Sequence, residues 1–259
     1  MSRVHLFEFE DQKWFPSFLR NYMTDFLQFL SNKTRLYDPI IPILVKGLQK
    51  SRTNTIIDLG SGGGGGLLSI NNGLLGQMPE VQITMTDFYP NLSAFTHVNK
   101  VAPNIDYVKT PVDARKVPES LAGLRTQFLS LHHFKPKDAQ AILQNAVDSG
   151  NAIAVFEAQE RNLASLLGML FSPLSVLFTT PLIRPFSWGR IVFTYLIPLV
   201  PVFVLWDGIV SCLRTYSIKE MKTIVKNLHQ TETYDWEISK VKSGPGALLY
   251  LLGTKKSRV

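Results

Sequence analysis

Cysteine is almost absent from this chain of 259 residues, which contains Cys212 alone. A single thiol excludes an intrachain disulfide and every zinc or iron–sulfur site that needs several cysteines, so a reducing compartment fits. The first 30 residues also lack the basic end and apolar run of a signal peptide, because they include Glu8, Glu10, Asp11 and Trp14. We therefore expect a cytoplasmic protein.

Charged residues are also few, at 18% of the chain against 45% apolar residues. This composition excludes a disordered, collagen-like or coiled-coil protein, and the length suffices for one large domain or two small ones. The net charge of +7 is uneven: residues 1–58 contribute +2, residues 59–157 contribute −1 and residues 158–259 contribute +6. Because the basic residues accompany apolar runs and not stacking aromatic ones, we expect no nucleic-acid partner.

Short apolar or β-rich runs alternate with helical or turn-rich segments through the middle of the chain. The expected strands cover residues 55–59, 81–86, 105–108, 127–131 and 152–156. This alternation predicts βαβ units around a parallel sheet. Two further strands, at 234–241 and 247–252, flank the turn residues 244–246 and predict a closing hairpin. Amphipathic spacing predicts helices over 18–30 and 43–49, and a capping box of Ser217 and Glu220 predicts one over 218–228.

A run of glycines follows the first of these strands. Residues 56–66 read Ile-Ile-Asp-Leu-Gly-Ser-Gly-Gly-Gly-Gly-Gly, and Asp87 ends the next strand 21 residues beyond Gly66. A glycine turn between a strand and a helix, with an acid at that distance, is typical of a nucleotide-binding unit. Gly60, Gly62 and Gly65 match the dinucleotide fingerprint, which keeps an NAD(P)-dependent oxidoreductase open as an alternative. Asp58 argues against it, because a carboxylate repels a pyrophosphate and suits a ligand with a cationic amino group.

The segment Asp58-Leu-Gly-Ser-Gly-Gly-Gly64 resembles the first motif of the class I S-adenosylmethionine-dependent methyltransferases. Asp87, in Thr86-Asp-Phe-Tyr-Pro-Asn91, resembles the acid that ends their second strand, and Val112-Asp-Ala-Arg115 resembles the motif after their third strand. The resemblance implies a Rossmann-like α/β fold, a mostly parallel seven-stranded sheet with an antiparallel last strand and helices on both faces.

The resemblance also implies S-adenosylmethionine as the cofactor and assigns its contacts. Asp58 and the glycines Gly60, Gly62 and Gly64 would face its methionine part. Asp87 would hold both ribose hydroxyls, and Phe88 would stack on the adenine. Asp113 would accept a hydrogen bond from the adenine amino group, and Ala114 would donate a hydrogen bond from its backbone N–H.

Two adjacent histidines follow the fourth expected strand, in Leu131-His-His-Phe134, which resembles the segment at that place in many small-molecule methyltransferases. Transfer of a methyl group to a hydroxyl needs a base, and histidine suits neutral pH, so we expect His132 or His133 to serve as that base. For Glu157, after the fifth strand, we favour a helix cap over a place in the pocket. No His, Asp or Glu residues have metal-ligand spacing, so the sequence predicts no metal site.

The chain divides into an N-terminal helical cover (1–52) and a methyltransferase domain (53–259) with an apolar insert at 162–213. Residues 163–183 carry no charge at all. A substrate-enclosing lid, a membrane-surface hairpin, a dimer interface and ordinary core all remain open, whereas four prolines disfavour a regular pair of membrane-spanning helices. Basic residues flank the apolar runs, which favours peripheral contact with the inner face of a membrane.

From these observations we expect transfer of a methyl group to an apolar small-molecule or lipid-like acceptor, on oxygen. Two alternatives stay open: the oxidoreductase described above, and a membrane-associated protein that keeps the fold without catalysing a reaction. The identity of the acceptor and the oligomeric state do not follow from the sequence.

Overall fold

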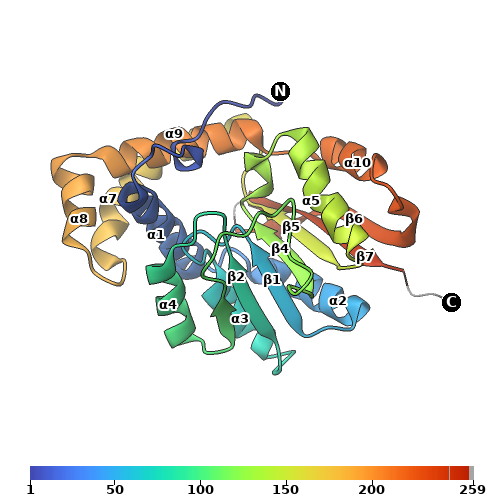
Figure 1. Ribbon diagram of the computed structural model, residues 1–259. Coiled ribbons are helices and arrows are strands. Elements are labelled where there is room, and N and C mark those ends of the chain that lie inside the picture. Colours follow the sequence, from blue (N-terminus) through green and yellow to red (C-terminus); the bar gives the residue numbers. More distant parts are fainter. Residues whose placement is uncertain (245, 257–259) are drawn as a thin grey trace.

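Seven strands form one sheet in the order β3-β2-β1-β4-β5-β7-β6 (Figure 1). The computed structural model describes residues 1–244 and 246–256, so Pro245 of the expected hairpin turn and the last three residues of the expected domain lie outside it. The strands are β1 Thr55–Leu59, β2 Gln82–Thr86, β3 Ile105–Tyr107, β4 Leu124–Phe128, β5 Ile153–Glu157, β6 Tyr234–Ser243 and β7 Gly246–Lys255. β1 to β5 are parallel, and β7 runs antiparallel to both β5 and β6. The predicted fold class is therefore confirmed.

Helices cover both faces of the sheet. The helices of one face are α2 Ile41–Ser51, α3 Leu67–Leu75 and α4 Leu92–Val101, and those of the other are α5 Pro136–Asp148 and α10 Ile218–Lys226. The predicted capping box at the start of α10 is present, with the Ser217 side chain accepting from the backbone of Glu220. Each face has its own apolar core, as a doubly covered parallel sheet requires.

The fourth strand lies three residues earlier than the sequence predicted. β4 covers Leu124–Phe128, not 127–131, and residues 131–133 form a short 3-10 helix. The apolar pattern placed this strand too late in the chain because the strand contains Arg125, Thr126 and Gln127, which are polar and yet fully buried. Leu129 has a φ of 50°, so the chain leaves the strand direction just after β4.

A helical layer extends to one side of the sheet (Figure 1). It comprises α1 Ser17–Lys33 and the helices of the insert: α6 Leu163–Met169, α7 Ser172–Thr179, α8 Trp188–Ile191 and α9 Leu199–Arg214. A third apolar core joins these elements through Phe15, Met23, Val176 and Val204, among others. Helix α1 thus packs against the insert on one side and against the glycine turn on the other.

The first residues of the chain run along α9 toward α1 (Figure 1). We call residues 3–11 the N-terminal strap. Its backbone is held by α9: Val4 N donates to Leu213 O (3.1 Å), and Phe9 N donates to Asp207 Oδ1 (2.8 Å). The strap therefore connects the insert to the loop that carries the two histidines.

Candidate active site

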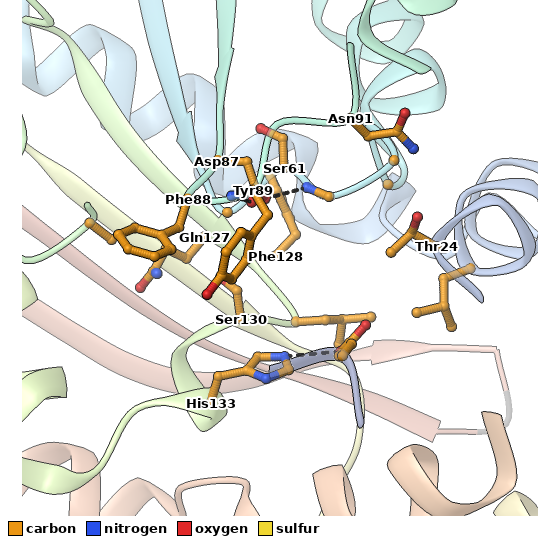
Figure 2. A pocket seen from close by; sticks show the side chains of 18 of the residues that line it. Thr24, Ser61, Asp87, Phe88, Tyr89, Asn91, Gln127, Phe128, Ser130 and His133 are labelled. Carbon is orange, nitrogen blue, oxygen red and sulfur yellow. Dashed lines mark hydrogen bonds and ion pairs between the residues drawn. The ribbon is translucent and has the colours of Figure 1, made fainter. Parts of the chain in front are cut away.

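A cavity of about 390 Å³ lies at the carboxyl ends of β1, β2 and β4. Ligands bind at this edge in open α/β sheets, and the volume falls in the usual range for small-molecule sites. In Figure 2, Asp87 and Phe88 lie on one side of the cavity, His133 and Ser130 on another, and Thr24 reaches it from helix α1. The cavity therefore brings together residues from the sheet, the N-terminal helix and the strap.

The glycine turn is packed on both sides. An added Cβ at Gly63 would come within 3.2 Å of the Thr24 backbone, and one at Gly66 would come within 2.4 Å of the Tyr37 ring. Gly62 and Gly65 have φ values of 54° and 44°, in the left-handed region. The long glycine run thus lets helix α1 close over the turn, which the methyltransferase resemblance alone did not explain.

Most backbone donors of this turn are already used. Gly60 N and Ser61 N both donate to Thr86 O (2.9 Å each), and Gly62 N donates to Asp87 Oδ2 (2.8 Å). A pyrophosphate needs such donors for itself and is repelled by a carboxylate among them. This arrangement disfavours the dinucleotide alternative.

Asp58 lies beneath the turn and is only 2% exposed. Its carboxylate accepts hydrogen bonds from Ser61 Oγ (2.6 Å) and Thr126 Oγ1 (2.8 Å). Burial raises the pKa of Asp58 to about 7, against the opposing effect of the two hydroxyl donors. The structure gives Asp58 a role in shaping the turn, and its contact with a cofactor amino group stays a prediction.

The other residues expected to bind the cofactor line the cavity together. They are Gly60, Gly62, Asp87, Phe88, Asp113 and Ala114, whereas Gly64 packs against Val98. Asp87 Oδ1 accepts from Tyr89 N (2.7 Å), and each oxygen of a carboxylate has a further lone pair for a hydroxyl. Asp113 is already paired with Arg115 (Nη2 to Oδ2, 2.7 Å), which lowers the pKa of Asp113. An adenine amino group would therefore share that carboxylate with Arg115.

Gln127 is a site residue that the sequence analysis missed. Its side chain lines the cavity from β4 and is fully buried (Figure 2). Neither Nε2 nor Oε1 has a hydrogen-bond partner among residues 1–244 and 246–256. A buried amide with no partner costs about 1–3 kcal/mol, so this side chain fits a ligand that bonds to it. The signal in the sequence was a glutamine within an otherwise buried strand.

His132 lies behind the cavity wall, 1% exposed. Its Nδ1 is 2.8 Å from Glu157 Oε2, and its backbone N donates to Glu157 Oε1 (3.1 Å). The interpretation of Glu157 as a helix cap is therefore wrong, because the fold turns this carboxylate back onto the histidine loop. The parallel pairing of β4 with β5 explains the contact, since both strands end at the same edge.

His133 lines the cavity and meets three carboxylates of the strap. Its Nδ1 lies 2.9 Å from Asp11 Oδ1 and 3.1 Å from Glu8 Oε2, and its Nε2 lies 3.4 Å from Glu10 Oε1. Burial alone would lower the pKa of His133, but the carboxylates of Glu8, Asp11 and Glu10 outweigh it and raise that pKa well above the ordinary value. His133 is therefore an imidazolium at neutral pH in the free protein.

Glu10 also lines the cavity, with its side chain 19% exposed. Burial raises the pKa of Glu10 to about 8; the positive His133 opposes the shift, and the nearby carboxylates of Glu8, Asp207 and Asp11 add to it. A carboxyl group that titrates near 8 is a stronger proton acceptor, once ionised, than an ordinary glutamate. Sequence spacing gave no sign of this, because Glu10 is 123 positions away from His133 in the chain.

Helix α9 fixes the strap through two buried charges. Asp207 accepts from the backbone N of Phe9 (2.8 Å) and of Glu10 (3.2 Å). Arg214 Nη1 pairs with Asp11 Oδ2 (2.7 Å) and Glu8 Oε1 (2.8 Å). The insert therefore determines where the strap carboxylates stand relative to His133.

Glu8, His132 and His133 also form a possible metal-ligand group, with donor atoms within 4.8 Å of one another. The prediction of no metal site considered spacing along the chain and could not foresee this group. Here Arg214 and the protonated His133 already neutralise the Glu8 carboxylate. We therefore interpret the group as an ion-pair network, in which buried charges are paired as they must be.

Comparisons with known proteins support the fold. No protein-family model matches the chain. A search of curated proteins found no relative. Among solved structures, the methyltransferase domain of bacterial CtHen1 aligns over 85% of this chain and 99% of its own at 14% identity, with a TM-score of 0.52. Human N-acetylserotonin methyltransferase in complex with S-adenosylmethionine aligns over 91% of this chain and 57% of its own at 15% identity, with a TM-score of 0.50.

A Rhodobacter sphaeroides protein whose name suggests a Zn-dependent alcohol dehydrogenase also aligns, over 92% of this chain and 98% of its own, at 11% identity and a TM-score of 0.51. The chain spans little more than half the length of the O-methyltransferases that it matches. At these identities the matches establish the class I methyltransferase fold and leave the reaction to be argued from the site.

Proposed function

We propose that this chain transfers a methyl group from S-adenosylmethionine to an oxygen atom of an apolar small-molecule or lipid-like acceptor. The observation that carries the proposal is the shared cavity. It joins the glycine turn, the ribose-binding acid expected at Asp87 and the unpartnered amide of Gln127 to the proton-exchanging pair Glu10 and His133. When bound, the cofactor supplies an electrophilic methyl group on a sulfonium.

The residues present fit this cofactor. The glycine side of the cavity has no Cβ atoms to fill it, and a Cβ added at Gly65 would meet nothing within 4 Å. Asp87 offers two oxygens for ribose hydroxyls, and Phe88 offers an exposed ring for the adenine (Figure 2). We assign the methionine part to the space under Tyr37, beside the glycine turn and Gln127.

The acceptor would lie between the glycine turn and His133. Leu27, Phe128 and Phe134 supply apolar contacts there, which suits a molecule with a carbon skeleton. As the acceptor oxygen formed its bond to the methyl group, the bond from that methyl to the sulfonium sulfur would break with its electron pair left on sulfur, and the hydroxyl proton would leave for the Glu10–His133 pair. Glu10 would receive this proton when its carboxyl group is ionised. Before the transfer, the positive His133 would stabilise the negative charge of the Glu10 carboxylate. His132 and Glu157 support the loop from behind.

Titration calorimetry with S-adenosylhomocysteine and, separately, with NADH tests the cofactor assignment. We expect binding of the first ligand and none of the second. Binding of NADH alone would overturn the proposal in favour of the oxidoreductase. Transfer of tritium from methyl-labelled S-adenosylmethionine to a panel of phenols and fatty acids then tests the acceptor class. A protein that binds the cofactor product but methylates none of a broad panel would favour the non-catalytic alternative.

A further inference from the structure

The insert presents an apolar surface that nothing in the described chain covers. We call residues 163–206 the apolar arm; it comprises α6, α7, α8 and the first half of α9. Of the 25 large apolar side chains that are exposed among the described residues, 14 belong to this arm. Phe178 and Leu196 are each 77% exposed, and Trp188 is 75% exposed. An exposed apolar area of this kind marks a binding surface.

The arm has the dimensions of a membrane element. Leu163–Leu182 is long and apolar enough to cross a bilayer, with a mean hydropathy of 1.7, yet only 11% of its most apolar window is buried. A core helix of a water-exposed domain would be mostly buried, and a signal sequence would lie near the N-terminus, so neither explains the segment. The second apolar stretch, Trp188–Leu196 followed by Leu199–Arg214, is bent by 78°.

Two threonine hydroxyls of the arm donate to backbone oxygens of the arm itself, whereas the buried Ser172 Oγ has no partner among the described residues. Thr179 Oγ1 donates to Ser175 O (2.7 Å), and Thr180 Oγ1 donates to Val176 O (2.7 Å). A protein partner would normally find hydrogen-bonding groups at the rim of such a surface, whereas hydrocarbon requires them to be paired internally. The internal pairing of these threonine hydroxyls suits a hydrocarbon environment.

The turn between α7 and α8 is satisfied in the same way. Arg184 donates to the carbonyl oxygen of Pro181 (2.9 Å), and Arg190 donates to those of Ile183 (3.1 Å) and Pro185 (2.7 Å). Two guanidinium groups thus bond backbone oxygens of this turn, and Arg184 is itself exposed.

The same contacts correct the electrostatic part of the sequence interpretation. Arg190 is 1% exposed and pairs with Asp25, and Arg214 is 3% exposed and pairs with Glu8 and Asp11. Arg161 pairs with Glu220. These three arginines hold the protein together and do not face headgroups. Of the basic residues that flank the apolar runs, Arg184, Lys219, Lys222 and Lys226 are exposed, so we infer that the larger apolar surface supplies the main force.

The arm cannot cross a bilayer, because its inner side packs along α1. That helix carries Arg20 and Asp25 and lines the cavity. Placing such a helix in hydrocarbon would bury its charges at a high cost. An arm bound on one side to a polar helix can enter only one leaflet.

From these observations we propose that the apolar arm inserts into one leaflet of a lipid bilayer by apolar contact, largely independent of lipid charge. This inference goes beyond the methyl transfer and does not depend on it. Aromatic side chains near the α8 turn, Phe186, Trp188 and Tyr195, are exposed and suit the headgroup boundary.

Flotation with phosphatidylcholine vesicles, with and without phosphatidylserine, tests this inference at low and high salt. We expect the protein to float with neutral vesicles and to stay bound at high salt. Phe178→Glu combined with Leu196→Glu should lower the bound fraction by at least about tenfold, because charges enter hydrocarbon poorly. The matched control is Val101→Glu, which replaces an exposed apolar residue of α4 (58% exposed) and should float like the wild type.

Three results would overturn the inference: failure to float, flotation only with anionic vesicles followed by release in salt, or a stable dimer that the arm variants dissociate. Circular dichroism of the arm variant guards against misfolding. Asp87→Ala separates the two proposals, because it should lose S-adenosylhomocysteine binding and still float. Loss of flotation in that variant would count against an independent membrane surface.

Discussion

Asp87 Oδ2 accepts a hydrogen bond of 2.8 Å from the backbone N of Gly62, which joins the end of β2 to the glycine turn. One carboxylate thus shapes the turn and faces the cavity. We expect Asp87→Ala to weaken S-adenosylhomocysteine binding by about 10- to 100-fold, because it removes charged hydrogen bonds of roughly 1.5–3 kcal/mol. Calorimetry measures the change. Asp106→Ala, an exposed acid on β3, should bind normally; equal loss in both variants would contradict the assignment.

Replacing Gln127 should affect ligand binding and protein stability in different directions. Replacing its unpartnered amide by the apolar side chain of similar size, in Gln127→Leu, removes a buried polar group with no partner in the described part of the chain. We expect the melting temperature to hold or rise, while affinity for S-adenosylhomocysteine falls by about 5- to 100-fold. Differential scanning fluorimetry and calorimetry check the two effects. A variant that is less stable but binds normally would show that Gln127 is structural.

Gly66 and Gly76 differ in what a side chain would meet. A Cβ at Gly66 would lie 2.4 Å from the Tyr37 ring, whereas one at Gly76 would have 3.7 Å to the nearest atom. We expect Gly66→Ala to destabilise the fold by about 1–3 kcal/mol and Gly76→Ala to be neutral or to stabilise it by up to about 1 kcal/mol. Urea unfolding distinguishes them. Equal stabilities would mean that Tyr37 moves freely.

The sequence predicted the sheet well because the signals were local. The first motif, Asp58 to Gly64, and the acid Asp87 fix where β1 and β2 end, and the capping box at Ser217 marks the start of α10. β4 was misplaced because buried polar residues such as Arg125 broke the apolar pattern, and their burial depends on the whole fold.

The candidate base site was only half predictable. His132 and His133 follow a strand, which is a local pattern, but their partners are Glu157 and Glu10. Glu10 reaches His133 only because Asp207, in the distant insert, binds the strap backbone. No spacing rule along the chain connects three segments so far apart. Two of the basic residues that flank the insert, Arg190 and Arg214, pair with Asp25 and Asp11 near the N-terminus, which no pattern along the chain could show.

The ion pairs of His133 predict that stability falls as the pH rises. The pKa of His133 is higher in the folded state than in the unfolded state, where it is about 6.5. The stabilisation that protonated His133 supplies is therefore complete below pH 6.5 and is lost as the pH rises past the raised pKa. The pKa of Glu10 is about 8 in the folded state and 4.5 in the unfolded state. Between pH 4.5 and 8 the folded protein therefore binds more protons than the unfolded chain, so its stability falls as the pH rises.

Between pH 5 and 8 we therefore expect the free energy of unfolding to fall, with Glu10 contributing about 3 kcal/mol. Glu10→Gln should flatten that part of the profile. Urea unfolding at several pH values measures it, with the exposed His229→Gln as a control that keeps the wild-type slope. A profile that rises over this range would refute the assigned protonation states.

The protonation state of His133 can be tested directly, because nearby carboxylates raise its pKa well above the ordinary value. Imidazole nitrogen-15 NMR should show His133 doubly protonated at pH 7, because Asp11 and Glu8 lie within 3.1 Å of its Nδ1, and Asp11→Asn should lower its pKa.

Activity with an accepted substrate then assigns the proton transfer. If Glu10 receives the proton, the rate should rise with pH up to about 8, since Glu10 must be ionised, and Glu10→Gln should lower the turnover by about 10²- to 10⁴-fold with little change in cofactor affinity. His133→Gln should lower turnover similarly and shift the pH profile to higher values, because the positive imidazolium that lowers the pKa of Glu10 is lost. His132→Gln should mainly reduce stability. A full loss of turnover in His132→Gln, with a wild-type pH profile in Glu10→Gln, would instead make the buried histidine the base.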